Sequence, residues 1–207
     1  MKITQKRAWF VLHRIREVFN VDKSNFNKTV ELDELYVGGK EKNKHANKRT
    51  KNNQGRSTKT KTPVLGILER GGKVYAVPVK NTQSKNIKPI INELVEKGTT
   101  VYTDEWRAYN SLNSEYKRDI VCHSAGEYVR GDVHTNGIEN FWSHFKRTII
   151  GTCFQISDQH LASYVNEASY RYNNRDLTDG SRFNVTLANA EKRLSYKELI
   201  ARKTKRA

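Results

Sequence analysis

Hydrophobic and polar residues alternate with the period of a strand in some segments of the chain and with the period of a helix in others. Five segments have the strand pattern: 29–37, 63–69, 73–79, 99–103 and 119–123. Six segments have the helical pattern: 4–19, 84–97, 106–112, 136–150, 158–173 and 186–202. Strands joined by short turns pair antiparallel, whereas strands joined through helices run parallel. The order of the segments therefore predicts an α/β fold with a mixed five-stranded sheet, in which three antiparallel strands precede parallel ones and helices cover both faces.

Asp33 lies in the middle of the apolar strand 29–37, where aspartate is unfavourable unless another group compensates it. Alternation places Glu31, Asp33 and Leu35 on one face of this strand and Glu34 on the other. Two interpretations of Asp33 are open at this point. It is either an acid paired with one of the chain's many lysines or a functional carboxylate.

Asp104 and Glu139 are each open to a local and a functional interpretation. Asp104 follows the fourth predicted strand, at the carboxyl end where open α/β sheets bind their ligands. It is equally well placed to begin the short helix 106–112 as its N-cap. Asn136 and Glu139 are spaced like a capping box at the start of the helix 136–150.

The helix 136–150 has an apolar stripe on one side and a separate polar face. The polar face consists of Asn136, Glu139, Ser143 and Lys146. Glu139 and Lys146 are seven residues apart, so they lie two turns apart on nearly the same side. A capping role for Glu139 leaves Lys146 unexplained.

Asp33, Asp104 and Glu139 come from two strands and a helix that can meet at one edge of the sheet. Carboxylates are the hard oxygen ligands that Mg²⁺ and Mn²⁺ prefer. Two such ions about 3.5–4 Å apart can activate an attacking oxygen and stabilise the leaving one in phosphodiester displacement. Together the three acids predict a metal site of this kind, with Lys146 beside it as a contact for DNA phosphate.

Basic residues exceed acidic ones, and most of the excess lies in two stretches of the chain. The 207 residues include 38 Lys and Arg against 22 Asp and Glu, a net charge of +16. In 40–62 nine basic side chains face one acid, and in 192–207 seven face one. Such an excess predicts a polyanionic partner, here DNA. The DNA contacts expected in the first stretch are Lys48, Arg49, Lys51 and Arg56.

Other classes of protein do not fit the composition. No apolar run approaches the ~20 residues of a membrane span, and no signal peptide begins the chain. Cys122 and Cys153 are too few for a disulfide framework, so we expect a cytoplasmic protein. These cysteines are irregularly spaced from His123 and His134, which favours core and polar-network roles over a zinc site.

Three motifs carry a resemblance to a known family. They are LDELYVGG (32–39), YTDEWRAY (102–109) and HTNGIENFW (134–142), the last followed by FKR at 145–147. They resemble the motifs of insertion-sequence transposases of the DDE superfamily, which have an RNase H-like core. The likeness is greatest to the bacterial branch with an N-terminal zinc ribbon and helix-turn-helix. The step of 35 residues from Asp104 to Glu139 is typical of that superfamily.

The resemblance implies an activity and a set of site residues. It implies that Asp33, Asp104 and Glu139 hold two Mg²⁺ ions, which Mn²⁺ can replace, with Asn136 as the reserve third ligand. Lys146 and the adjacent Arg147 are the implied DNA contacts. The implied enzyme is a two-metal polynucleotidyl transferase that hydrolyses transposon ends and joins the 3′-hydroxyl to target DNA. A homodimer or larger assembly on DNA, associated with the bacterial nucleoid, is expected.

The same resemblance suggests three regions. Residues 1–22 look like the remnant of a helix-turn-helix unit, residues 23–175 like the RNase H-like catalytic domain with a basic insertion at 40–62, and residues 176–207 like a basic helical tail. The zinc ribbon and most of the helix-turn-helix are missing from this sequence. The alternative function is therefore a truncated, non-catalytic DNA-binding remnant that represses an intact transposase.

Two further enzyme classes are alternatives. A recombinase with a covalent nucleophile has ten Tyr to draw on, but no His-x-His pair or Arg/His/Arg set surrounds one of them. A related phosphodiesterase on the same fold, such as a Holliday-junction nuclease, is the other. Divalent-metal-dependent cleavage separates every enzyme interpretation from the DNA-binding remnant.

Overall fold

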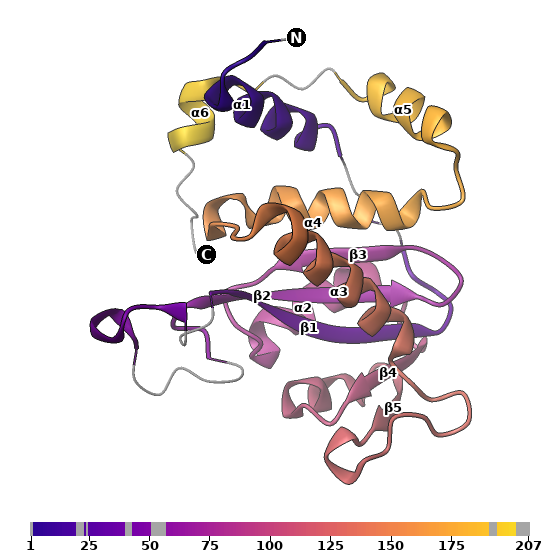
Figure 1. Ribbon diagram of the computed structural model, residues 1–207. Coiled ribbons are helices and arrows are strands. Elements are labelled where there is room, and N and C mark those ends of the chain that lie inside the picture. The colour runs from indigo at the N-terminus through magenta and orange to yellow at the C-terminus, as the bar shows by residue number, and fades with distance from the viewer. Residues whose placement is uncertain are drawn as a thin grey trace.

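The computed structural model describes residues 2–19, 23, 25–39, 43–50, 57–190 and 194–201. At its centre lies a five-stranded sheet with the strand order β3-β2-β1-β4-β5 (Figure 1). The strands are β1 (Val30–Gly38), β2 (Lys61–Glu69), β3 (Val74–Pro78), β4 (Thr100–Asp104) and β5 (Lys117–Val121). The first three strands pair antiparallel, whereas β4 runs parallel to both β1 and β5. The predicted α/β fold, a mixed RNase H-like sheet with helices on both faces, is confirmed.

Helices cover both faces of this sheet. The α-helices of the described residues are α1 (Gln5–Arg16), α2 (Ser84–Leu94), α3 (Asn136–Thr148), α4 (Asp158–Asn173), α5 (Asp179–Ala188) and α6 (Tyr196–Ala201). Shorter helical segments are η2 (Ala46–Lys48), η3 (Arg107–Leu112), η4 (His123–Ala125) and the π-helical η5 (Ile149–Cys153). Within the described ranges, we find no helix with the length and apolar character needed to cross a bilayer.

Alternation along β1 divides the core into two halves. Val30 and Leu32 point to the side of α2, where they pack with Ile87 and Ile91. Leu35 points to the opposite side, where α3 and α4 lie. There it meets the predicted apolar stripe of α3, which consists of Ile138, Phe141, Trp142 and Phe145, all buried. The polar face of α3 is consequently left on the outside, as the sequence predicts.

Gly66 on β2 allows α3 to approach the sheet closely. It pairs across the ladder with Asp33 of β1. A Cβ atom at this position would lie 2.5 Å from the ring of Trp142 and 2.8 Å from the side chain of Ile138. The missing side chain thus brings the first turns of α3 close to the strand that carries Asp33.

Helices α1, α5 and α6 lie on the side of α4 that faces away from the sheet (Figure 1). Trp9 packs edge-on against His160 of α4, with ring centroids 5.5 Å apart. Arg16 forms an ion pair of 2.9 Å with Glu167 of the same helix. The first helix therefore packs on the body of the protein, although its outer apolar residues Val11, Leu12 and Ile15 are exposed.

The predicted helix 186–202 is wrong. The structure has two helices here, because α5 ends at Ala188 and α6 begins only at Tyr196. Thr178 begins α5 by accepting a hydrogen bond from the Ser181 N–H at 3.2 Å. This cap starts the helix earlier than the apolar pattern indicates.

Two other predicted boundaries shift by a few residues. Helix α2 ends at Leu94 because Val95 is extended and forms a bridge with Phe26. Strand β5 lies two residues earlier than predicted, since its register with β4 begins with Thr100 beside Lys117. The short helix predicted at 106–112 is the 3₁₀-helix η3 (Arg107–Leu112).

The last residue of α4 contacts the outer edge of β3. The side-chain oxygen of Asn173 accepts a hydrogen bond from the Val74 N–H at 2.7 Å, and its amide nitrogen donates to the Val74 carbonyl at 2.9 Å. The side chain thereby pairs with the backbone of this edge strand as a neighbouring strand would.

Candidate active site

Asp33 and Asp104 lie on adjacent parallel strands. The pairing of β1 with β4 sets Val30 beside Val101 and Glu31 beside Tyr102. Continuing this register by two residues sets Asp33 beside Asp104, so both side chains point to the face of the sheet that α3 covers. Asp104 is the last residue of β4 and is buried.

The surroundings of Asp33 disfavour its charged form. Burial, the largest cause, raises the pKa of Asp33 from the ordinary 3.8 to about 8. The neighbouring carboxylate of Glu34 adds to the rise, and so do those of Asp104 and Glu139. Three separate elements therefore bring negative charge to bear on one half-buried aspartate.

Asp104 also makes the local contact expected of a helix cap. Its Oδ1 accepts a hydrogen bond from the Trp106 N–H at 3.0 Å, just before η3 begins. The local and the functional interpretation of this residue are thus compatible. One carboxylate oxygen can orient the side chain while the acid faces its neighbours on β1 and α3.

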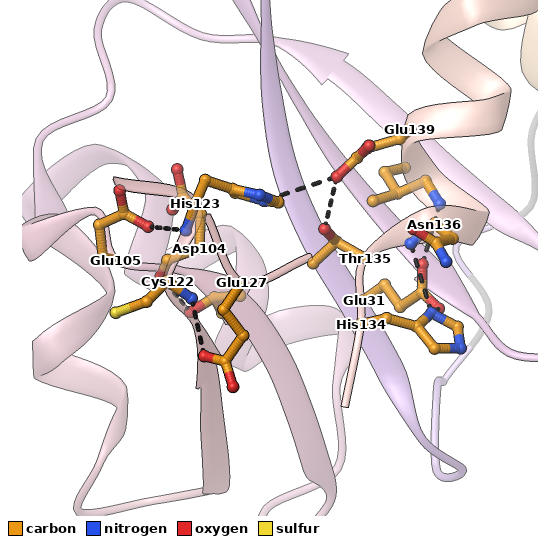
Figure 2. Close-up of polar contacts among 12 residues, drawn as sticks. Glu31, Asp104, Glu105, Cys122, His123, Glu127, His134, Thr135, Asn136 and Glu139 are labelled. Carbon is orange, nitrogen blue, oxygen red and sulfur yellow. Dashed lines mark hydrogen bonds and ion pairs between the residues drawn. The ribbon is translucent and has the colours of Figure 1, made fainter. Parts of the chain in front are cut away.

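Glu139 lies in the first turn of α3, and its side chain is 46% exposed. Its Oε1 accepts a hydrogen bond from the Thr135 hydroxyl at 2.7 Å. The Nε2 of His123, which follows β5, lies 3.6 Å from the same oxygen (Figure 2). The proposed capping box at Asn136 is wrong, because Thr135 occupies the cap position and Asn136 is already helical.

A second carboxylate on β1, Glu31, is fully compensated. Its side chain is 1% exposed. Oε1 accepts a hydrogen bond from Nε of Arg70 at 2.8 Å, and Oε2 accepts one from the Ile138 N–H at 2.9 Å. Nδ1 of His134 also lies 3.5 Å from Oε1, but it accepts from Nη2 of Arg70 and so supplies no donor to Glu31. Figure 2 shows Glu31 and His134 together at the start of α3.

Most of the chain matches a known protein family. Residues 25–173 match the ISXO2-like transposase domain, which is well over half of the sequence. The chain belongs to this transposase family. No solved structure matches it.

Two curated relatives of this transposase domain carry descriptions that fit. One is an "uncharacterized protein in transposable element ISH50" of Halobacterium salinarum, 30% identical over 154 residues. These residues are 70% of this chain and 52% of the relative, so the chain spans about half of that protein. The other is an "uncharacterized transposase-like protein" of Haemophilus influenzae, 38% identical over 106 residues, which are 51% of this chain and 85% of the relative.

The remaining residues predicted on α3 of the transposase domain lie on its outer surface. Asn136 is exposed at the first position of α3, and its N–H donates to Nδ1 of His134 at 3.4 Å. Lys146 and Arg147 are exposed in the last turn. Their charges stand two turns beyond Glu139 along the same helix.

The basic stretch leaves the sheet where β1 ends (Figure 1). Lys48 and Arg49 are exposed here, and Nε of Arg49 donates to the Lys44 carbonyl at 3.1 Å. Lys51 and Arg56 lie outside the described residues. Because β1 and β4 are parallel, this stretch projects beyond the same end of the sheet at which Asp104 lies.

The donor set of the transposase domain fits a hard divalent cation. The carboxylates around Asp33 are the ligands that Mg²⁺ prefers, and a bound cation would relieve the repulsion that raises the pKa of Asp33. Among the described residues, however, no three His, Cys, Asp or Glu side chains gather closely enough to hold a metal ion. The side chain of Glu139 points instead to Thr135 and His123 (Figure 2).

Sequence reasoning missed the contacts that hold these acids. The sequence patterns do not single out Arg70, and they assign His123 only a core or polar-network role. Glu31 was recognised as an acid on the same face as Asp33, but not as a buried one. In the structure, a Cβ at Gly137 would lie 2.9 Å from Oε2 of Glu31, a closeness that the sequence does not reveal.

Proposed function

We propose that this transposase domain catalyses metal-dependent hydrolysis of phosphodiester bonds at transposon ends and transfer of the 3′-hydroxyl to target DNA. The observation that carries the proposal is the register of β1 and β4, which brings the first two motif acids, Asp33 and Asp104, side by side. Glu139, from the third motif, acts electrostatically on Asp33. The family match supports the same function.

Asp33, Asp104 and Glu139 are the proposed ligands of two Mg²⁺ ions, which Mn²⁺ can replace. When bound, the ions supply activation of the attacking oxygen and stabilisation of the leaving one. Asn136, exposed at the start of α3, is the reserve ligand. Burial and the neighbouring acids raise the pKa of Asp33 to about 8, and a cation held by these carboxylates would favour the deprotonated form of Asp33.

The other residues of the chain bind and orient the substrate and the ligands. The Thr135 hydroxyl donates a hydrogen bond to Oε1 of Glu139. This contact fixes the orientation of the carboxylate, including its second oxygen. Lys146 and Arg147 are proposed to hold DNA phosphates beside the acids, and Lys48 and Arg49 to hold DNA beyond the end of β1. Lys51 and Arg56 are proposed to act with them. Since transposition joins two ends, we propose a dimer or larger assembly on DNA in the bacterial cytoplasm.

The test is cleavage of a labelled duplex carrying the transposon end, with Mg²⁺ or Mn²⁺ and with EDTA. Asp33→Asn, Asp104→Asn and Glu139→Gln keep the side-chain size and remove the charge. We expect each to abolish cleavage and strand transfer while DNA binding is retained.

Glu34→Gln is the matched control, because Glu34 lies next to Asp33 but on the opposite face of β1. Its Oε2 accepts a hydrogen bond from the Tyr109 hydroxyl at 2.7 Å, and glutamine keeps an acceptor there. We expect a mild effect. Equal cleavage by the wild type and by Asp104→Asn would contradict the assignment, and DNA binding without any cleavage would favour the repressing remnant.

A further inference from the structure

We infer that Glu31 and Arg70 are positioning residues that hold Glu139 in place relative to Asp33 and Asp104. The inference rests on the proposed function and assigns a role to two residues outside the proposed ligand set. The side chain of Glu31 is 1% exposed and that of Arg70 is 25% exposed. They act through the elements that carry the three acids.

Glu31 fixes the start of α3. Its Oε2 accepts the Ile138 N–H at 2.9 Å, and Ile138 directly precedes Glu139. This amide belongs to the first turn of the helix, where N–H groups have no partner within the helix and a carboxylate is favoured by the helix dipole. The fit is close, because even the Cβ of an alanine at Gly137 would lie 2.9 Å from the same oxygen.

Arg70 fixes the segment that leads into α3. Its Nη1 donates to the Asp132 carbonyl at 2.7 Å, and its Nη2 donates to the His134 carbonyl at 2.9 Å. Nη2 also lies 2.9 Å from Nδ1 of His134. A guanidinium can only donate, so this ring nitrogen is an acceptor. The remaining donor, Nε, goes to Glu31.

Arg70 also touches the strand that carries the second aspartate. Its guanidinium lies over the ring of Tyr102, 4.6 Å from the ring centroid. Tyr102 precedes Asp104 by two residues on β4, and Glu31 precedes Asp33 by two residues on β1. Residues two apart on a strand point to the same face, so Glu31 lies on the face of Asp33 and Tyr102 on the face of Asp104.

The Glu31–Arg70 pair therefore contacts each of the three elements close to its acid. On each strand it acts two residues before the aspartate, and on α3 it acts one residue before the glutamate. Residues that orient metal ligands in this way commonly change metal affinity or activity by about 10–100-fold when they are replaced. The pair thus links β1, β4 and α3 and fixes the positions of the three acids relative to one another.

The experiment compares hydrogen exchange and Mn²⁺ binding of the full chain and its variants. Arg70→Gln removes the charge and the three-directional donor set. Glu31→Gln leaves one acceptor atom where Glu31 offers two. Arg16→Gln is the matched control. It breaks another Arg–Glu ion pair, the 2.9 Å contact of Arg16 with Glu167, which joins α1 to α4 away from the acids. Arg70→Lys keeps the positive charge but loses the planar guanidinium that donates in three directions.

Exchange is followed by mass spectrometry in peptides from the first turn of α3 and from β2, and Mn²⁺ affinity by calorimetry. For Arg70→Gln and Glu31→Gln we expect faster exchange at α3, unchanged exchange in β2, and Mn²⁺ affinity lower by about 10–100-fold. We expect Arg70→Lys to be intermediate and Arg16→Gln to change neither readout.

Unchanged exchange at α3 in Arg70→Gln would overturn the inference, and so would an equal loss of Mn²⁺ affinity in Arg16→Gln. A uniform rise of exchange across β2 and α3 would also overturn it, because this indicates general destabilisation. If the wild-type chain binds no Mn²⁺, the proposed metal-dependent function is wrong. The local exchange at α3 then still decides whether the pair positions the helix.

Discussion

Two carboxylates two residues apart on the same face of β1 have opposite surroundings. Glu31 is buried and has an arginine and a helix amide for its two oxygens. Asp33 is half-buried, and its neighbours Glu34, Asp104 and Glu139 are all acids that raise its pKa. One end of this short strand segment is electrostatically compensated, and the other is not.

The comparison separates an acid that is paired within the fold from one that is proposed as a metal ligand. Charge that is removed from water destabilises a fold unless it is paired. Glu31 is paired within the chain and so stabilises the contact between β1 and α3. The pKa of Asp33 is raised by burial and by the acids Glu34, Asp104 and Glu139, a pattern typical of functional sites.

The largest difference between the two carboxylates should appear in catalysis. We expect Asp33→Asn to lower single-turnover cleavage of a labelled transposon end by about 10³-fold, the scale of losing a group that acts on charge in the transition state. Glu31→Gln should lower it by about 10–100-fold. Equal rates for these two variants would remove the distinction between ligand and positioning residue.

The order reverses for stability. Glu31→Ala leaves the Arg70 guanidinium and the Ile138 N–H without their acceptor, and should lower the free energy of unfolding by about 3 kcal/mol. Asp33→Ala removes an unfavourable charge and should cause no loss at pH 8. Urea unfolding in EDTA measures both. A larger loss in Asp33→Ala than in Glu31→Ala would contradict the comparison.

The pH dependence of stability sharpens the contrast. Between its ordinary pKa of 3.8 and about 8, Asp33 holds a proton in the folded state that the unfolded chain has released. The free energy of unfolding therefore falls as the pH rises through this range. We expect the melting temperature of Asp33→Asn to exceed that of the wild type in EDTA, by more at pH 8 than at pH 5.

Glu115 provides the opposite case for the same measurement. Hydrogen bonds from Lys88 and Lys97 lower its pKa from 4.5 to about 2, so its contribution is present above pH 4.5 and is lost as the pH falls towards 2. We expect Glu115→Gln to melt below the wild type at pH 5, with the difference closing near pH 2. A constant difference across this range would indicate that the charge of Glu115 is not involved.

The smallest expected effect concerns the DNA contacts proposed on α3. Lys146→Gln and Arg147→Gln should each lower the slope of log affinity against log salt by about 1. Lys85→Gln, on α2 at the opposite face, is the control and should leave the slope unchanged. Fluorescence anisotropy with a labelled duplex at several salt concentrations measures all three. Unchanged slopes for the α3 variants would exclude phosphate contacts at these positions.

The parts of the fold that follow local periodicity could be predicted from the sequence. Alternation along β1 and the 3.6-residue period of α3 are properties of neighbouring residues. The sequence therefore shows which residues lie on each face of these two elements. The compensation of Glu31 is not readable, because Arg70 lies 39 residues away and the Ile138 amide 107 residues away. The burial of an acid and the identity of its partner both depend on the packed sheet.

The C-terminal helices show a second limit of the same kind. Apolar spacing in 186–202 is compatible with one long helix. The choice between one helix and two depends on the cap at Thr178 and on a connection of which 191–193 lie outside the described residues. Where the apolar periodicity is weak, the ends of helices are set by caps and tertiary contacts.

The contact of Asn173 with β3 has a consequence for how copies of the protein behave at high concentration. An open strand edge invites strands of other molecules to pair with it, which is a common route to aggregation. Here one side-chain amide uses both the N–H and the carbonyl of Val74. A foreign strand would have to displace α4 from this position before it could extend the sheet. At high concentration, copies of the chain are thereby kept from joining their sheets at this position of β3.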